Sequence, residues 1–139
     1  MIRHWPRRHR GLRRPASRRF IRRDPLDALF SKVIRLRDKV CQRCGRVGGR
    51  LEAAHMFGRG HHAVRYDFEN CFAMCGGLSP NSCHRWLDTH TTEKMAWLKA
   101  RLGEERFNAL QVRARMPSKL DRGLIKLALE RRVKELEDG

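Results

Sequence analysis

The sequence is poor in acidic residues and has no long apolar run. Its 139 residues contain 15 Asp and Glu against 32 Lys and Arg, a formal net charge of +17. No apolar stretch approaches the roughly 18 residues that a transmembrane helix needs, and the basic segments lack the wide apolar face of a helix that lies on a membrane. The positive charge therefore favours a polyanionic partner, and DNA is the first candidate. We do not expect a membrane as the partner.

The sequence also lacks the usual features of a secreted protein. It has no leading segment with an apolar centre of about 7–15 residues, as a signal peptide would have. Its five cysteines are an odd number, which disfavours a framework of disulfides. Only 7% of the residues are aromatic, so a small core would gain stability from a bound metal. We therefore expect a cytoplasmic protein whose reduced cysteines bind a metal.

The first 23 residues contain ten arginines and no acid. Pro6, Gly11 and Pro15 argue against regular secondary structure, so we expect a flexible basic arm that contacts nucleic acid or simply remains solvated. An Arg-rich start is also typical of mitochondrial transit peptides, but these prolines would interrupt the amphipathic helix of such a peptide. Subtracting the ten arginines from 32 Lys and Arg leaves 22 against 15 acids, a charge of +7 on residues 24–139.

The rest of the chain predicts one α+β domain that is mostly helical. In DPLDALFSKVIRLRDKV, apolar residues recur every three or four positions, with Asp24 as the N-cap and Pro25 in the first turn. RLEAAH, residues 50–55, and FENCFAMC, residues 68–75, predict two short strands joined by a polar loop. The sequence thus predicts a helix followed by a hairpin.

The remaining segments predict helices. One begins near Pro80 or Asn81 and carries CHRWLD. Three more are expected over residues 92–102, 104–115 and 119–137. We therefore divide the chain into the arm, a core over residues 24–90, and a helical region over residues 91–139 that packs on the core or mediates dimerisation.

The cysteines predict a structural zinc site. Cys41 and Cys44 in CQRCG have the two-residue spacing with which a pair of thiolates binds one tetrahedral zinc ion. Cys75 and Cys83 can supply the second pair, although seven residues separate them. Cys71 competes with Cys75, but we expect it to be a free thiol on the buried side of the second strand. The predicted ligands are Cys41, Cys44, Cys75 and Cys83.

A second metal site is suggested by CHRWLD. His84 directly follows Cys83, so on a helix its side chain points away from the sulfur site. His84 and Asp88 share a helical face at i, i+4 spacing, at which an imidazole and a carboxylate can bind one ion. His55, at the end of the first expected strand, should face them. Each of these residues taken singly is also compatible with a solvated surface position.

The order of CQRCG, LEAAH, DFEN, AMC and CHRWLD resembles the HNH endonuclease superfamily. The segments VIRLRDKVCQRCG, GRGHHAVRYDFEN and WLKARLG are similar to bacteriophage NinG/Rap-like recombination endonucleases, and the resemblance covers roughly residues 29–136. It implies a zinc-stapled ββα-metal (HNH) core with flanking α-helices. It further implies that His55 is the general base that activates water and that Asn70 fixes the loop and the orientation of the histidine. His84 and Asp88 would bind a catalytic Mg²⁺ or Mn²⁺.

One position departs from the family pattern. Many members have Asp or His immediately before the base as a further metal ligand, but this chain has Ala54. Water and phosphate oxygens can complete the coordination of a hard cation, and Glu52, His61 and Asp67 are candidate protein donors. The ligand that replaces the missing donor is left open by the sequence.

The loop between the strands contains candidate nucleic-acid contacts. Arg59, His61 and Arg65 are expected to contact DNA there. The two arginines can each bind a phosphate with two parallel hydrogen bonds, or each can be a solvated charge.

The residue patterns predict a metal-dependent protein that acts on DNA, and the resemblance implies an HNH endonuclease, encoded by a phage and acting on recombination or replication intermediates in the host cytoplasm. The alternatives are a non-catalytic zinc-ribbon protein that binds nucleic acid and an assembly factor that docks on RNA through the arm. His55, Asn70 and His84 discriminate between these classes, because binding alone does not need them. The oligomeric state is open, and a homodimer is one option.

Overall fold

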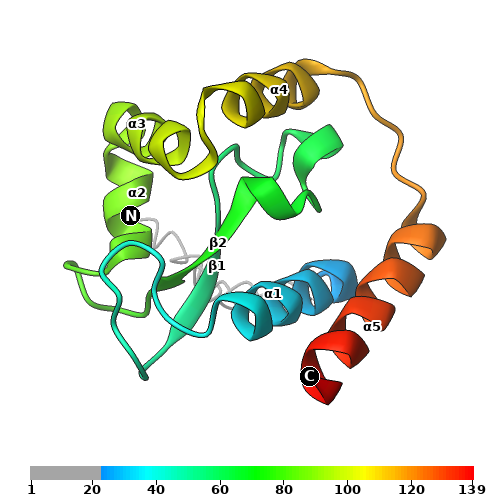
Figure 1. Cartoon of the computed structure of the whole chain (residues 1–139), viewed down its shortest axis with the longest axis horizontal. Helices are drawn as coiled ribbons and strands as arrows, with labels where there is room; N and C mark the ends of the chain where they lie inside the picture. Colours follow the sequence, from blue (N-terminus) through cyan, green and yellow to red (C-terminus); the bar gives the residue numbers. More distant parts are fainter. Residues whose placement is uncertain (1–22) are drawn as a thin grey trace, which may run out of the picture.

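The computed structural model describes residues 23–139, so the expected basic arm lies outside the described residues except for Arg23. The fold is α+β and mostly helical (Figure 1). Its helices are α1 (Pro25–Asp38), α2 (Cys83–Thr89), α3 (Thr91–Leu102), α4 (Glu104–Arg115) and α5 (Arg122–Asp138), and its strands are β1 (Leu51–His55) and β2 (Cys71–Cys75). Among these residues, no helix is both long enough and apolar enough to cross a membrane.

Helix α1 begins where its sequence predicts. The side chain of Asp24 accepts a hydrogen bond from the Leu26 N–H at 2.9 Å, and Pro25 occupies the first turn. This satisfies one of the backbone donors that have no partner at a helix N-terminus. The helix ends at Asp38, and its C-cap Lys39, with a φ of 64°, turns the chain toward the first cysteines.

Three element boundaries differ from the sequence prediction. Residues 68–70 form a 3₁₀ turn and not the start of β2, because Asp67 accepts a hydrogen bond from the Glu69 N–H at 2.9 Å. Helix α2 begins at Cys83, after Ser82 as its N-cap. Helix α5 begins at Arg122 and not near Lys119, because the side chain of Asp121 accepts from the Leu124 N–H at 3.0 Å. In each case a side-chain cap fixes the boundary.

Strands β1 and β2 pair antiparallel, from Leu51 opposite Cys75 to His55 opposite Cys71. All five residues of β2 are buried. Successive side chains of a strand point to opposite faces, so Cys71 and Ala73 join one apolar cluster while Phe72 and Met74 join another. Cys71 is therefore a buried thiol, as its sequence context predicts.

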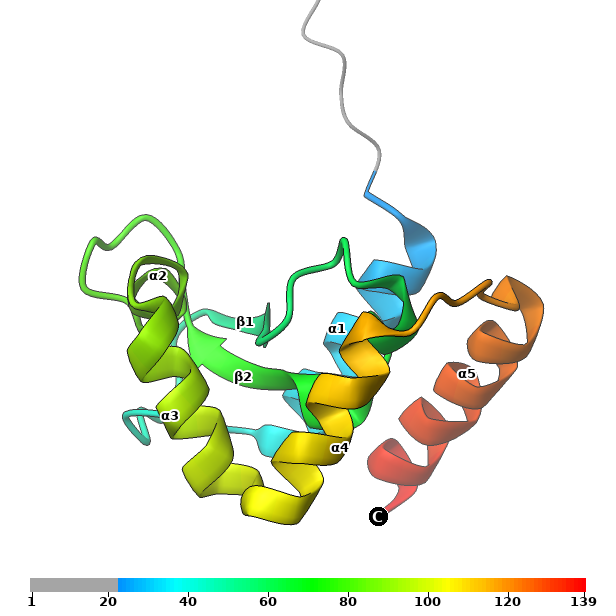
Figure 2. The same cartoon turned by 90° about the horizontal axis from the view of Figure 1, so that it is seen from above.

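The two faces of the sheet carry different helices (Figures 1 and 2). On one face, Phe30 and Ile34 of α1 pack with Leu129 and Val133 of α5. On the other face, the buried residues of α2, α3 and α4 form a second cluster with β2. The helical region after residue 90 is thus divided between both faces.

Strand β1 forms the free edge of the sheet. The opposite edge, β2, is covered by the turn that follows α1, where Gln42 N–H donates to the Ala73 carbonyl at 2.9 Å. The Arg50 carbonyl accepts from Gly76 N–H, and Met56 N–H donates to the Asn70 carbonyl. Because paired and unpaired residues alternate in an antiparallel ladder, the peptide groups of residues 51, 53 and 55 point away from β2.

Candidate active site and metal centre

Four cysteines from three segments of the chain meet at one end of the sheet. Cys41 and Cys44 follow α1, Cys75 ends β2, and Cys83 begins α2. Their sulfur atoms all lie within 4.8 Å of one another, and the Cys44 and Cys75 Sγ atoms are 3.9 Å apart. A tetrahedral zinc ion with Zn–S bonds of about 2.3 Å separates its sulfur ligands by about 3.8 Å. The four cysteines are therefore positioned to hold a metal ion, and their geometry is consistent with a structural zinc.

The thiols of this cluster differ in acidity. Burial opposes ionisation of Cys41, but backbone N–H groups donate to its sulfur and lower its pKa to about 6. Burial and the neighbouring thiols raise the pKa of Cys83 to about 12. Burial also raises the pKa of the isolated Cys71 thiol above its usual range. Four adjacent thiolates need a cation to balance their charge, so metal binding would release protons.

Arg43 connects this cluster to α2. Its guanidinium donates to the Cys83 Sγ at 3.4 Å and lies 3.7 Å from the centre of the Trp86 ring. The Trp86 ring stacks in turn on His90, with centroids 4.8 Å apart. These contacts hold the short helix that carries His84.

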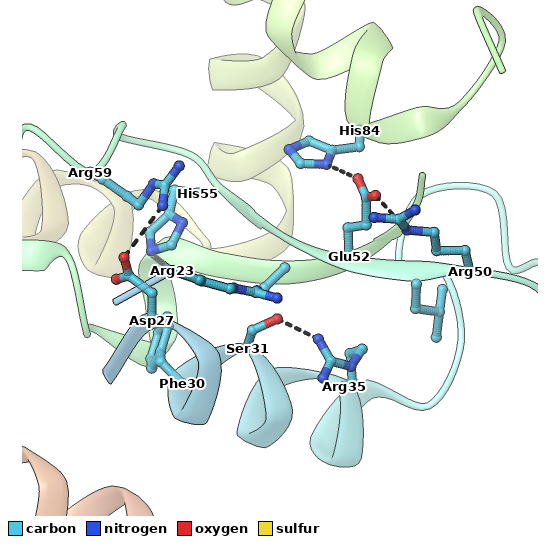
Figure 3. A pocket seen from close by; sticks show the side chains of 12 residues that line it. Arg23, Asp27, Phe30, Ser31, Arg35, Arg50, Glu52, His55, Arg59 and His84 are labelled. Carbon is cyan, nitrogen blue, oxygen red and sulfur yellow. Dashed lines mark hydrogen bonds and ion pairs between the residues drawn. The ribbon is translucent and has the colours of Figure 1, made fainter. Parts of the chain in front are cut away.

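A cleft of about 660 Å³ lies along the free edge of β1, between α1 and the start of α2 (Figure 3). His55 lies toward one end of it and His84 toward the other, and α1 forms the opposite wall. Its lining residues are mostly polar or charged: Arg23, Asp27, Phe30, Ser31, Arg35, Arg50, Leu51, Glu52, Ala53, His55, Arg59 and His84.

Glu52 and His84 meet in this cleft. The Glu52 Oε2 lies 2.7 Å from the His84 Nδ1, and Arg50 Nε lies 2.9 Å from the Glu52 Oε1. Burial opposes ionisation of Glu52, but hydrogen bonds from His84 and the Gly77 N–H lower its pKa. The cleft thus contains a charged carboxylate against an imidazole.

Asp88 lies at the margin of this pair. It shares the face of α2 with His84, as its spacing predicts, but its Oδ2 is 4.0 Å from the His84 Nε2 and its side chain is 65% exposed. Within residues 23–139, the four cysteines are the only group of three or more metal-binding side chains whose donor atoms already converge. Glu52, His84 and Asp88 would have to close around a cation.

The structure separates the other two candidate donors from His84. The His61 Nδ1 lies 3.2 Å from the Ala114 carbonyl, and Asp67 accepts from Arg113 at 2.9 Å. Both side chains therefore contact α4 and do not line the cleft. Of the three donors that the sequence left open, Glu52 is the one beside His84.

His55 has a defined tautomer. Its Nε2 lies 2.8 Å from the Arg65 carbonyl oxygen, which can only accept, so Nε2 carries the hydrogen and Nδ1 keeps its lone pair. Within residues 23–139, Nδ1 has no hydrogen-bond partner. Burial lowers the pKa of His55, and the nearby charge of Arg59 adds to the effect. The ring is therefore neutral near neutral pH and retains a basic nitrogen.

Asn70 holds the loop that supplies the Arg65 carbonyl. Its side chain is fully buried and makes three hydrogen bonds to this loop. Oδ1 accepts from Phe57 N–H at 2.7 Å, while Nδ2 donates to the Phe57 and Val64 carbonyls at 2.9 and 3.0 Å. These contacts are the ones expected of a residue that fixes this loop.

The sequence did not reveal a buried ion pair beside His55. Asp27 is 7% exposed and accepts two hydrogen bonds from Arg65, at 3.0 and 2.6 Å, and one from the Tyr66 hydroxyl at 3.2 Å. Burial opposes ionisation of Asp27, but the Arg65 guanidinium lowers its pKa. The only available signal was an acid on the apolar face of α1, since Arg65 is 38 residues away.

The three residues expected to contact nucleic acid have different surroundings. The Arg65 side chain is 19% exposed and is bound by Asp27, so it has a structural role in addition to the predicted one. Arg59 is 61% exposed with a single longer contact to Asp27 at 3.3 Å, and His61 is exposed. Contact with DNA stays a prediction for all three.

No protein-family model, curated protein or solved structure matches the chain. The two sites described above have different characters. The cysteine cluster is suited to a structural metal ion. The cleft combines a neutral histidine with a carboxylate–imidazole pair and lining arginines, a set suited to acid–base chemistry on an anion.

Proposed function

We propose that the chain is a metal-dependent HNH endonuclease that hydrolyses DNA phosphodiester bonds, a phage enzyme acting on recombination or replication intermediates. The observation that carries this proposal is the neutral His55, whose Nε2–H is held by the Arg65 carbonyl. His55 lines the same cleft as the Glu52–His84 pair. A protein that only binds nucleic acid needs neither feature.

His55 acts as the general base. Its Nδ1 takes a proton from a water molecule, which then attacks the phosphorus atom in line with the leaving oxygen. The lowered pKa of His55 supports this role, because the ring is unprotonated before the reaction. Asn70 maintains the loop whose carbonyl orients the ring.

Glu52 and His84 would hold a catalytic Mg²⁺ or Mn²⁺, with Asp88 as a further donor. A carboxylate oxygen suits these hard cations, and here Glu52 takes the part for which many family members use the residue at Ala54. Such a cation stabilises the negative charge that develops on the phosphate and on the leaving oxygen. A zinc ion on the four cysteines would be structural, because all four ligand positions come from the protein.

The second candidate is a non-catalytic zinc protein that binds nucleic acid. It is favoured by the convergence of metal donors at the cysteines and their lack of convergence at Glu52 and His84. Both candidates use the charge of +17 for affinity. The two candidates differ in the role of His55, which is the general base in the nuclease and only a packed side chain in the binding protein.

Plasmid nicking with Mg²⁺ or Mn²⁺ distinguishes the two candidates. We expect the zinc-loaded parent protein to nick only when Mg²⁺ or Mn²⁺ is added, and a loss of about 10²–10⁴-fold in His55→Ala with zinc content and DNA affinity retained. His84→Ala should need more Mn²⁺ for the same rate. His62→Ala, an exposed loop histidine, is the matched control. Equal rates for His55→Ala and the parent would refute the proposal.

A further inference from the structure

Helix α1 presents a polar stripe to the cleft. Asp27, Ser31 and Arg35 follow one another at spacings of four, so they share one face of the helix. At 1.5 Å rise per residue, Asp27 and Arg35 are about 12 Å apart along the axis. Asp27 lies near His55, and Arg35 lies across the cleft from Arg50 and Glu52 (Figure 3).

Arg35 and Arg23 are the two arginines of the cleft that have no acidic partner among the described residues, and of these two only Arg35 is half-buried. Arg59 and Arg65 are bound by Asp27, and Arg50 is bound by Glu52. Arg35 donates only to the hydroxyl of Ser31, and within residues 23–139 it has no carboxylate partner. The cleft therefore contains one half-buried guanidinium whose charge no described acid balances.

The geometry of this pair suits an anion. A cation that has lost part of its hydration without gaining a counter-charge is costly, and a bound anion removes that cost. Ser31 is buried and accepts from Arg35, which leaves its own hydroxyl proton free to donate. The guanidinium retains donors in the planar fork that matches the oxygens of a phosphate.

We propose that Arg35, oriented by Ser31, binds a phosphate of the nucleic-acid strand at a position next to the one that is cut. The strand lies along the free edge of β1, with the scissile phosphate between His55 and the Glu52–His84 pair and the neighbouring phosphate against α1. The position of the cut rests on the proposed nuclease function. The phosphate site itself does not depend on that function, because a phosphate can bind there without any strand being cut.

Arg35 also lies in the last turn of α1, where a basic side chain stabilises the helix dipole. That role alone would affect stability and leave nucleic-acid binding unchanged. The two roles therefore separate in an experiment that measures both quantities.

The test uses the zinc-loaded protein without added Mg²⁺ or Mn²⁺, and measures binding of a labelled oligonucleotide, single-stranded and as a duplex, by fluorescence anisotropy at several salt concentrations. For Arg35→Gln we expect about a tenfold loss of affinity, as for one charged hydrogen bond. The slope of log K against log salt should shrink by about 0.7 for the single strand and 0.9 for the duplex. Arg35→Lys should keep the slope and lose part of the affinity, because it retains the charge but not the fork.

Arg131→Gln is the matched control, because it removes the same charge from an 83% exposed arginine of α5 that is paired with Glu135. Thermal unfolding checks that each variant is folded. If Arg35→Gln binds like Arg131→Gln at every salt concentration, the phosphate site does not exist. If Arg35→Gln and Arg35→Lys lose affinity while the parent protein never cuts DNA, the phosphate site stands and the nuclease proposal fails.

Discussion

Gly76 provides the space through which Glu52 reaches His84. A Cβ atom at Gly76 would lie 2.3 Å from the Cδ and Oε2 atoms of Glu52, far inside van der Waals contact. Because these atoms are the flexible end of a side chain, Gly76→Ala should displace the carboxylate and leave the fold intact. Gly76 contributes no side chain to the site, but its small size makes room for the Glu52 carboxylate.

We expect Gly76→Ala to weaken Mn²⁺ binding to the zinc-loaded protein about tenfold, as for other changes that misplace a ligand. Calorimetric titration measures the Mn²⁺ affinity. Gly60→Ala is the control, because no atom lies within 4 Å of a Cβ built at Gly60. Unchanged Mn²⁺ affinity in Gly76→Ala would mean that Glu52 is not a ligand. A coincident loss of thermal stability would show instead that the backbone had moved.

Asp27 stabilises the loop beside His55 by a buried ion pair. Asp27→Asn leaves the Arg65 guanidinium half-buried without its main partner, at a cost of about 2–3 kcal/mol in the free energy of unfolding. Denaturant unfolding measures this cost, and Glu135→Gln is the control, because the ion pairs of Glu135 lie on the exposed surface of α5 and contribute little to stability.

The effect of Asp27→Asn should depend on pH. The folded-state pKa of Asp27 is lowered by Arg65, so its stabilisation is complete above the unfolded value of about 3.9. As the pH falls through the lower folded-state pKa, the carboxyl is protonated and this stabilisation is lost. The difference between parent and variant should therefore shrink below about pH 4. A constant difference at all pH values would mean that the charge of Asp27 contributes nothing.

At the scale of elements, the cysteine cluster joins three parts of the fold. Cys41 and Cys44 belong to the turn after α1, Cys75 to the end of β2, and Cys83 to the start of α2. A metal ion there would fix the helix that carries His84 relative to the strand that carries Glu52. Stability and the geometry of the cleft should therefore depend on the same ion.

Cys41→Ser should lose the bound zinc and the cooperative unfolding transition together. Zinc content by elemental analysis and a thermal melt check this, and a chelator should have the same effect on the parent protein. Cys71→Ala is the control, because that buried thiol lies outside the cluster and its loss should leave one zinc per chain. A zinc-free Cys41→Ser with the parent's melting curve would contradict a structural role.

Elements with strong local signals were predictable from the sequence. Three features depend on residues only a few positions apart: the cap of α1, the short spacing of Cys41 and Cys44, and the alternation of side chains around Cys71. The boundary of β2 was wrong because the Asp67 cap competes with strand propensity over residues 68–70. A local pattern cannot show which of two local structures prevails.

Contacts between distant elements were not predictable in the same way. The sequence left Glu52 as one of three donors, because nothing local shows that it lies beside His84, 32 residues away. The pairing of Asp27 with Arg65 was missed for the same reason. The uncompensated charge of Arg35 becomes visible only after the partners of the neighbouring arginines are known.

At the scale of the whole molecule, the charge is unevenly distributed. Residues 1–22 contain nine arginines and no acid, which leaves 23 Lys and Arg against 15 acids, or +8, on residues 23–139. Many of the acids in the described part are already paired with arginines, at Asp27, Asp67 and Glu69 among others. We therefore expect the non-specific affinity for DNA to depend mainly on the N-terminal residues. The positioning of the strand should depend on the cleft.

Deleting residues 1–22 tests this division, because it retains Arg23 at the cleft. If about six of the nine arginines contact phosphates, the slope of log K against log salt for duplex binding should shrink by roughly five. Replacing the same arginines by lysine should keep most of the slope, because counter-ion release depends on charge. The truncated protein should still show the further loss on Arg35→Gln, since that phosphate site belongs to α1. An unchanged slope after the deletion would mean that residues 1–22 do not touch the nucleic acid.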